Sequence, residues 1–117
     1  MGDNEAQAVD STSADWAPLI GLNAGSANFP QRARLHGEGI IIFRTRDGFR
    51  GVERACPHMK ATMMEGELVS NDTMLRCPLH VFTFRLSDGK GVNCPGFRLR
   101  VFEVRQDGTQ FFARPVS

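Results

Sequence analysis

Two short segments of the chain each contain a cysteine, a proline and a histidine. Cys56-Pro57-His58 and Cys77-Pro78-Leu79-His80 each offer one thiol and one imidazole, which are ligands for transition metals. A proline after the cysteine fixes one backbone angle and stiffens a tight loop that presents a ligand. A Cys₂His₂ zinc finger places both cysteines in one element and both histidines in another. Here each segment supplies one of each, so the sequence predicts two loops that share a metal centre.

This ligand set fits a [2Fe–2S] cluster of mixed ligation. In a Rieske centre two cysteines hold one iron and two histidines hold the other, so each loop can supply one ligand to each iron. On these residues, and from about Trp16 to the C-terminus, the chain resembles the Rieske family. The resemblance implies one [2Fe–2S] cluster per chain, with Cys56 and Cys77 on the buried iron. It implies His58 and His80 on the outer iron. A structural zinc site stays open as an alternative, because zinc accepts the same ligands.

The pattern along the chain predicts an all-β domain. Short apolar runs are broken by Gly, Asp and Pro, and no segment has a convincing helical repeat. Turns are expected at Asp47-Gly48, Asn71-Asp72, Asp88-Gly89 and Asp107-Gly108. The strand pairs expected around them are 39–45 with 49–54, 66–69 with 73–76, and 99–105 with 109–115. The resemblance implies a Rieske-type antiparallel β-sandwich with an inserted cluster-binding subdomain at about residues 55–96.

Length and charge predict one domain with an acidic tail. A chain of 117 residues has room for one small core. Residues 1–14 are predicted to be a disordered tail, and residues 15–117 a Rieske domain. The first fifteen residues carry four acidic groups and no basic one, so the other 14 basic and 9 (13 minus 4) acidic residues give the body a charge of +5. Twelve of the basic residues are arginine, which fits either a solvated surface or docking to an acidic partner. Their scatter argues against nucleic-acid binding.

The cysteine count and hydropathy predict a cytoplasmic protein. Three cysteines are too few for a disulfide scaffold, and thiolates available to a cluster suit a reducing compartment. The longest apolar run, Ile40–Phe43, is far shorter than the roughly 20 residues of a membrane-spanning helix. The first fifteen residues lack the apolar stretch of a secretory signal. No membrane association is expected.

Residues beside the ligands predict a low reduction potential. Respiratory Rieske proteins join their ligand loops by a disulfide, but the matching positions here are Ala61 and Leu79. Those proteins also carry a serine and a tyrosine, whose hydroxyls donate hydrogen bonds to sulfur. Phe82 and Phe84 stand at those positions and have no donor. Since such bonds stabilise the extra electron, we expect a potential near the bottom of the Rieske range of roughly −150 to +300 mV.

Four further features complete the site prediction. Residues 91–96 resemble the proline-containing loop that covers the cluster in this family, and Cys94 within it is expected to pack rather than to ligate. Val81 departs from the glycine that often follows the second ligand histidine. His36, the only other histidine, is expected on a surface turn. One spare histidine cannot supply the mononuclear iron site of an oxygenase, so no catalytic residue is predicted.

These observations predict a soluble one-electron carrier rather than an enzyme. The resemblance implies a ferredoxin, expected to be a monomer, that passes electrons from a reductase to a ring-hydroxylating or related oxygenase. The alternative is a small Rieske-type subunit of an assimilatory nitrite reductase, which residues 84–89 and the Cys94-Pro95-Gly96 loop somewhat resemble.

Overall fold

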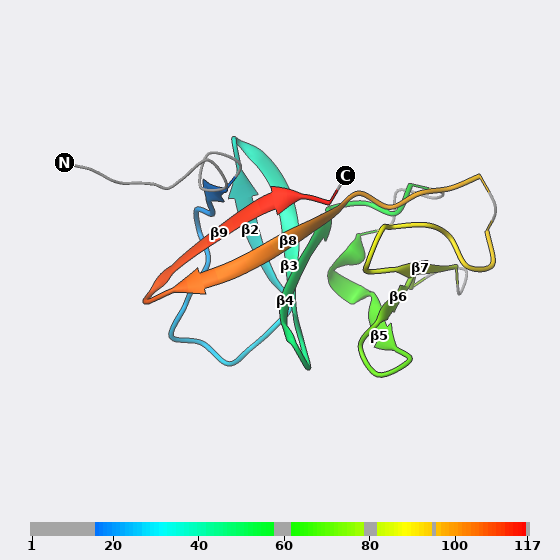
Figure 1. The fold of residues 1–117 in the computed structure, drawn as a ribbon, viewed down its shortest axis with the longest axis horizontal. Coiled ribbons are helices and arrows are strands. Elements are labelled where there is room, and N and C mark those ends of the chain that lie inside the picture. The colour runs from blue at the N-terminus through cyan, green and yellow to red at the C-terminus, as the bar shows by residue number, and fades with distance from the viewer. Residues whose placement is uncertain (1–15, 58–61, 79–81, 95, 117) are drawn as a thin grey trace.

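The computed structural model describes residues 16–57, 62–78, 82–94 and 96–116, and these form two antiparallel β-sheets (Figure 1). The strands are β1 (Ala17–Pro18), β2 (Gln31–Leu35), β3 (Glu38–Thr45), β4 (Gly48–Glu53), β5 (Glu67–Val69), β6 (Met74–Arg76), β7 (Thr83–Arg85), β8 (Val101–Asp107) and β9 (Gln110–Pro115). A single 3₁₀ turn, η1 (Met63–Glu65), is the only helical element in these ranges. The predicted all-β class is therefore confirmed. The same ranges hold no helix long and apolar enough to cross a membrane.

The larger sheet is the base of the molecule. Its strand order is β1-β9-β8-β4-β3-β2, so β8 and β4 lie at its centre and β3 lies between β4 and the edge strand β2. The apolar run in β3 is fully enclosed: Ile40 and Ile42 face one core, and Ile41 and Phe43 face the other. Successive side chains of a strand point to opposite faces, so an uninterrupted apolar run is typical of a strand covered on both sides.

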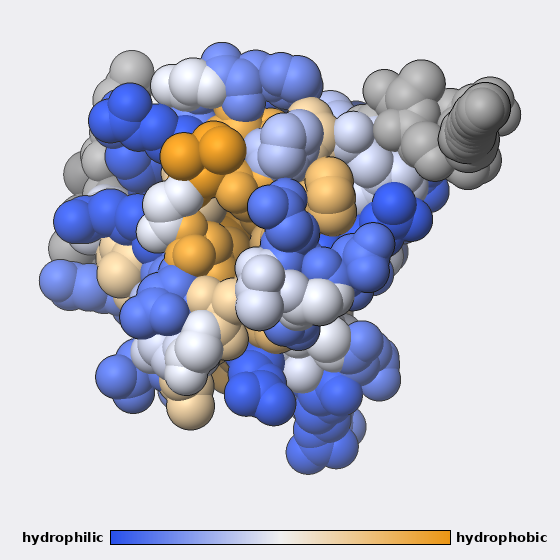
Figure 2. Space-filling model, turned by 90° about the vertical axis from the view of Figure 1, so that its left-hand side faces the viewer, coloured by the Kyte–Doolittle hydropathy of each residue, from blue (hydrophilic) through white to orange (hydrophobic). Residues whose placement is uncertain are grey.

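The two cores divide the molecule. The first core joins the inner face of the base to the small sheet and contains Val52, Leu75 and Phe84. The second core lies on the other face of the base and contains Leu35, Ile40, Ile42, Phe102 and Phe111. Figure 2 looks onto the end of the base that faces away from the small sheet, where a band of apolar side chains is bordered by hydrophilic ones.

The small sheet has the order β5-β6-β7 and lies at one end of the base (Figure 1). Each of its strands has three residues. Leu75 of β6 pairs with Phe84 of β7, and both side chains are fully buried in the first core. These two residues attach the small sheet to the base.

The turns lie where the Asp-Gly and Asn-Asp pairs predicted them. Gly48 has a φ angle of 135° and follows the β3–β4 turn. Gly108 has a φ angle of 65° and lies in the β8–β9 turn. In the first turn the tip is Arg46-Asp47, because Gly48 already pairs with Thr45. Between β5 and β6, Asn71 and Asp72 both have positive φ. The predicted hairpins are confirmed, with the first turn one residue earlier than the Asp-Gly pair.

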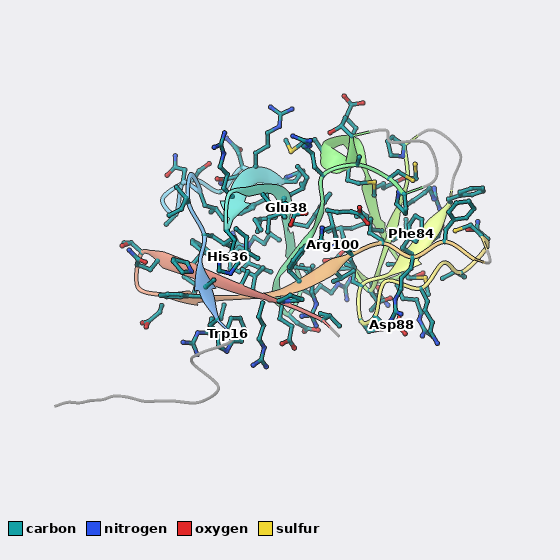
Figure 3. All side chains as sticks on the ribbon, turned by 90° about the horizontal axis from the view of Figure 1, so that it is seen from above. Trp16, His36, Glu38, Phe84, Asp88 and Arg100 are labelled. Carbon is teal, nitrogen blue, oxygen red and sulfur yellow. The ribbon has the colours of Figure 1, made fainter. Side chains whose placement is uncertain are left out.

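Trp16, the first described residue, packs against two arginines of the base. The guanidinium groups of Arg105 and Arg114 lie 4.9 and 4.5 Å from the centre of its ring. His36 lies in the turn between β2 and β3 and is exposed, as predicted (Figure 3).

Candidate metal centre

Both predicted ligand loops are closed by backbone pairing at their bases. The first, residues 56–61, is flanked by the bridge between Ala55 and Thr62. The second, residues 77–82, is flanked by the pair Arg76 and Thr83. The two loops therefore have the same length between paired positions. Each begins with its cysteine, which places that residue next to a hydrogen-bonded pair rather than at a free loop tip.

Further hydrogen bonds hold the cysteines in place. The N–H of Cys77 donates to the carbonyl of Phe82 across the base of the second loop, at 2.6 Å. The N–H of Met63 donates to the carbonyl of Arg54 at 2.9 Å, just outside the first loop. Short, closed loops limit the movement of the side chains that they present.

The two cysteine side chains are buried in the same core. Cys56 is 0% exposed and Cys77 is 1% exposed, and both belong to the first core. Neither forms a disulfide. Two thiols that form no disulfide and are enclosed in one apolar core fit the inner iron of a cluster, because thiolate is the ligand that iron–sulfur centres use. The predicted ligands His58 and His80 lie outside the described residues, as do Ala61, Leu79 and Val81.

A third loop is attached to the strand that leaves the second ligand loop. The N–H of Val92 donates to the carbonyl of Thr83 at 2.7 Å, and the Asn93 side-chain oxygen accepts from the Thr83 N–H at 2.9 Å. Gly91 lets the loop close, since a Cβ there would lie 2.6 Å from the Sγ atom of Cys94. The predicted covering loop is thus bound to β7 through Thr83 and through the pairing of Gly91 with Phe84.

Cys94 is buried in the first core beside the two predicted ligands. Its Sγ atom lies 3.9 Å from the carbonyl oxygen of Thr83. Burial raises the pKa of this thiol, and the neighbouring Cys77 adds to the rise. The role predicted for Cys94, packing rather than ligation, stays a prediction.

Comparison with known proteins decides the family. The family profile described as the Rieske [2Fe–2S] domain matches residues 15–103. This chain belongs to the Rieske [2Fe–2S] family. Its cofactor is accordingly a Rieske-type [2Fe–2S] cluster, and the buried thiols of Cys56 and Cys77 are suited to hold it.

Relatives of this Rieske domain include both small and large proteins. Over 74 residues it is 32% identical to the 3-phenylpropionate/cinnamic acid dioxygenase ferredoxin subunit of Shigella boydii, covering 62% of this chain and 69% of that subunit. Over 60 residues it is 38% identical to a cholesterol 7-desaturase of Ciona intestinalis, covering 50% of this chain. It spans only 13% of that desaturase. The shared unit is thus the Rieske domain, which some relatives carry within a much longer chain.

Solved structures share the fold of this Rieske domain. The ferredoxin of carbazole 1,9a-dioxygenase from Nocardioides aromaticivorans superposes with a TM-score of 0.68 at 22% identity, covering 85% of this chain and 98% of the ferredoxin. A protein described as the small subunit of an NADPH nitrite reductase superposes with a TM-score of 0.70 at 21% identity, covering 84% and 96%. Both likenesses confirm the Rieske-type fold.

Two phenylalanines make the surroundings of the cysteines apolar. Phe84 is 0% exposed and packs in the same core as Cys56 and Cys77 (Figure 3). Phe82, at the end of the second loop, is half-buried, and its ring centre lies 6.3 Å from that of Phe97. Neither ring can donate a hydrogen bond from a hydroxyl group. Their position beside the cluster sulfurs and their effect on the reduction potential stay predictions.

The third loop also carries two apolar side chains to the surface. Val92 is 52% exposed and Phe97 is 38% exposed. Exposed apolar side chains are available for contact with a partner. Neither was singled out from the sequence, because their position beside the ligand loops depends on how Thr83 binds residues 92 and 93.

Charged side chains stabilise the turn at Asp88, which precedes the third loop in the chain. The Asp88 carboxylate accepts hydrogen bonds from the Arg85 guanidinium and from the Lys90 N–H, the latter at 3.0 Å. The Arg85 bond, followed by the Lys90 bond, lowers the pKa of Asp88 to about 2. Arg98 donates to the Asp88 carbonyl at 3.1 Å. Gly89 lies so close to Leu99 that a Cβ would be 1.9 Å from its carbonyl oxygen.

Proposed function

We propose that this Rieske protein is a one-electron carrier of a multicomponent oxygenase system and not itself an enzyme. The observation that carries the proposal is the 32% identity to a dioxygenase ferredoxin subunit, most of whose length the chain covers. The bound cluster would supply a one-electron redox couple. The partners would be a ferredoxin reductase and a terminal oxygenase, in the cytoplasm, with the carrier exchanging between them as a monomer.

Each predicted ligand would have a distinct role. Cys56 and Cys77, enclosed in the first core, would hold the iron that is shielded from water. His58 and His80 would hold the outer iron and offer the shortest path to a partner. Val92 and Phe97, exposed beside these loops, would exclude water from the contact with that partner. Residues 55–96 would thus form a cluster-binding subdomain.

The potential of this carrier would be low. Hydrogen bonds to the cluster sulfurs raise the potential by stabilising the reduced state. Phe82 and Phe84 supply none from their side chains. A carrier of low potential can reduce an oxygenase but would be a poor oxidant of quinol.

Electron transfer to an oxygenase tests the proposal. The reductase and oxygenase of a 3-phenylpropionate/cinnamic acid dioxygenase system would be assayed without their own ferredoxin, and this protein would be added. We expect product formation that depends on its concentration and that a cluster-free Cys77→Ser variant does not support. Stable co-purification with a sirohaem enzyme, together with no transfer to the oxygenase, would instead favour the nitrite reductase subunit, whose fold is equally similar.

A further inference from the structure

A second candidate site lies on the base, away from the ligand loops. It is a surface hollow of about 630 Å³, which we call the arginine groove. Its principal lining residues are Arg32, Arg34, Arg54, Gly39, Ile41 and Ile20. Among the residues that the structure describes, no acidic one lines it. The hollow thus combines three cationic side chains with several apolar ones.

The strand register brings the arginines onto one face. Arg34 pairs with Gly39, and on its other side it pairs with Ile20. Paired residues on neighbouring antiparallel strands share a face of the sheet. A Cβ on Gly39 would lie 3.8 Å from the Cδ and Nη1 atoms of Arg54, so the Arg54 side chain extends over this glycine. Arg34 and Arg54 therefore flank a position that has no side chain. Arg32 pairs with Ile41 and adds a third cation to the same face.

The acidic residues nearby in the strands point the other way. Glu38 and Glu53 pair with Leu35 and Ile40, whose side chains lie in the second core on the opposite face of the base. Both glutamates already bind Arg100, which donates to Glu38 from its guanidinium and to Glu53 from its N–H at 2.7 Å (Figure 3). They are therefore not available to the groove.

The three groove arginines form no ion pair within the described part of the chain. By contrast, four other arginines do, and they are Arg76, Arg85, Arg100 and Arg114. Cations held together without counter-charges repel one another, and an anion that binds between them removes that cost. Arginine favours bidentate contact with carboxylates, and its aliphatic stem can cover apolar surface.

The groove adjoins the cluster-binding half of the molecule. Ile41 lines the groove and also belongs to the first core, together with Cys56 and Cys77. Arg54 lies two residues before Cys56, at the entry to the first ligand loop. A segment bound in the groove would therefore lie along the flank of that loop.

We propose that the arginine groove docks an acidic segment of the protein with which this carrier exchanges electrons. This inference rests on the proposed function and adds the chemistry of the partner: carboxylates to meet the three arginines and an apolar side chain to cover Ile20, which is 62% exposed. A nucleic-acid track would need basic residues extending beyond one hollow. The contact adds electrostatic steering to docking at the ligand loops and weakens as salt rises.

A glycine substitution gives a sharp test, because Gly39 lies between two of the arginines. Gly39→Glu would place a carboxylate in the groove, whereas Gly39→Gln would add the same bulk without charge. The φ angle of Gly39 is not in the left-handed region, so both side chains fit the strand. The probe is a capped pentapeptide with four glutamates around a central leucine, and the matched control replaces the glutamates by glutamines. Amide shifts of the ¹⁵N-labelled, oxidised holoprotein report where each peptide binds.

We expect the glutamate peptide to shift the amides of Ile20, Arg34, Gly39 and Arg54, and to bind more weakly at high salt. Gly39→Glu should weaken binding by roughly tenfold, because its carboxylate competes with the peptide for the two neighbouring arginines. Gly39→Gln should retain binding. Should Gly39→Glu fail to acquire the cluster, the surface pair Arg34→Gln and Arg54→Gln replaces it.

Other results would overturn the proposal. Equal shifts with the glutamine peptide, or no shifts in the groove, would show that the arginines do not select carboxylates. If deletion of the acidic residues 1–15 moves the same amides without peptide, the tail of this chain is the occupant. If the amides move with protein concentration alone, the occupant is a second copy. Because the readout is binding to the oxidised protein, it does not depend on electron transfer, and failure of the groove is distinct from failure of the carrier function.

Discussion

The base and the small sheet differ in the length and the burial of their strands. The inner strands of the base, β3, β4, β8 and β9, have between six and eight residues, and β3 is buried on both faces. Each strand of the small sheet has only three residues. Three-residue strands bury little apolar surface and are marginal by themselves. We infer that the base contributes most of the stability of the fold. The small sheet is stabilised by the first core and by the cluster that its loops are suited to hold.

Removal of a cluster ligand should produce the largest difference in hydrogen-exchange protection between the small sheet and the base. Cys77→Ser is expected to abolish the Rieske EPR signal and to expose the small-sheet amides of Leu75 and Phe84 to rapid hydrogen exchange. The amides of β3 and β8 should keep their protection, because both cores of the base remain. The measurement is hydrogen exchange by NMR on matched samples with and without the cluster.

Cys94→Ser is the control for this variant, since it removes a buried thiol of the same core that is predicted to pack and not to ligate. It should keep the cluster and the protection of the small sheet. If Cys94→Ser lost the cluster while Cys77→Ser kept it, the ligand assignment would be wrong.

Two glycine substitutions sharpen the comparison next. Gly89 has a φ of 81°, and its Cβ would lie 1.9 Å from the Leu99 carbonyl oxygen, whereas Gly108 in the β8–β9 turn has a φ of 65° and open space. Gly89→Ala should lower the free energy of unfolding by about 3 kcal/mol, from backbone strain plus a forced shift. Gly108→Ala should cost only about 1 kcal/mol, from the backbone alone. Urea unfolding of the holoprotein measures both, and equal losses would contradict the close approach at Gly89.

A hydroxyl group beside the cluster should change the potential by a smaller amount. Phe84→Tyr places a donor in the core that contains both cysteines. If it reaches a sulfur atom, we expect the reduction potential to rise by roughly 60 mV, which is a tenfold change in a one-electron equilibrium. Phe97→Tyr, at the exposed end of the third loop, is the matched control and should leave the potential unchanged. Protein-film voltammetry measures both potentials. A lower potential in Phe84→Tyr would contradict the claim that a hydroxyl donor beside the cluster raises the potential.

The smallest effect concerns the turn below the third loop. The pKa of Asp88 is lowered to about 2, so its carboxylate stabilises the fold above its ordinary pKa, and this contribution is lost as the pH falls from about 4 towards 2. Asp88→Asn should remove this part of the acid dependence and leave the slope at higher pH as it was. Acid titration of the unfolding midpoint measures the difference. An unchanged acid slope would show that the Arg85 and Lys90 contacts do not persist in solution.

Much of the fold could be predicted from local signals. Asp-Gly and Asn-Asp pairs indicated the hairpins because few residues tolerate positive φ, and the Ile40–Phe43 run indicated an inner strand. The strand Gln31–Leu35 was not predicted, since arginines occupy one of its faces and leave only two apolar side chains on the other. The two-residue strand Ala17–Pro18 gives no pattern at all.

The site could be predicted only in part. The paired spacings of cysteine and histidine pointed to the ligand loops, and the structure buries Cys56 and Cys77 together. Two features depend on contacts between distant segments: the attachment of the third loop to Thr83, and the convergence of Arg34 and Arg54 over Gly39. Strand register decides both, and a one-residue slip would move each side chain to the opposite face.

The reduction potential of the holoprotein is the most direct test of the proposal that this protein is a low-potential electron carrier. An anaerobic titration followed by EPR gives the cluster type and the potential in one experiment. We expect a Rieske signal with a potential near the bottom of the family range, at roughly −150 mV. A Rieske signal with a potential well above zero would contradict the low-potential carrier, because it would require donors to sulfur that Phe82 and Phe84 cannot supply.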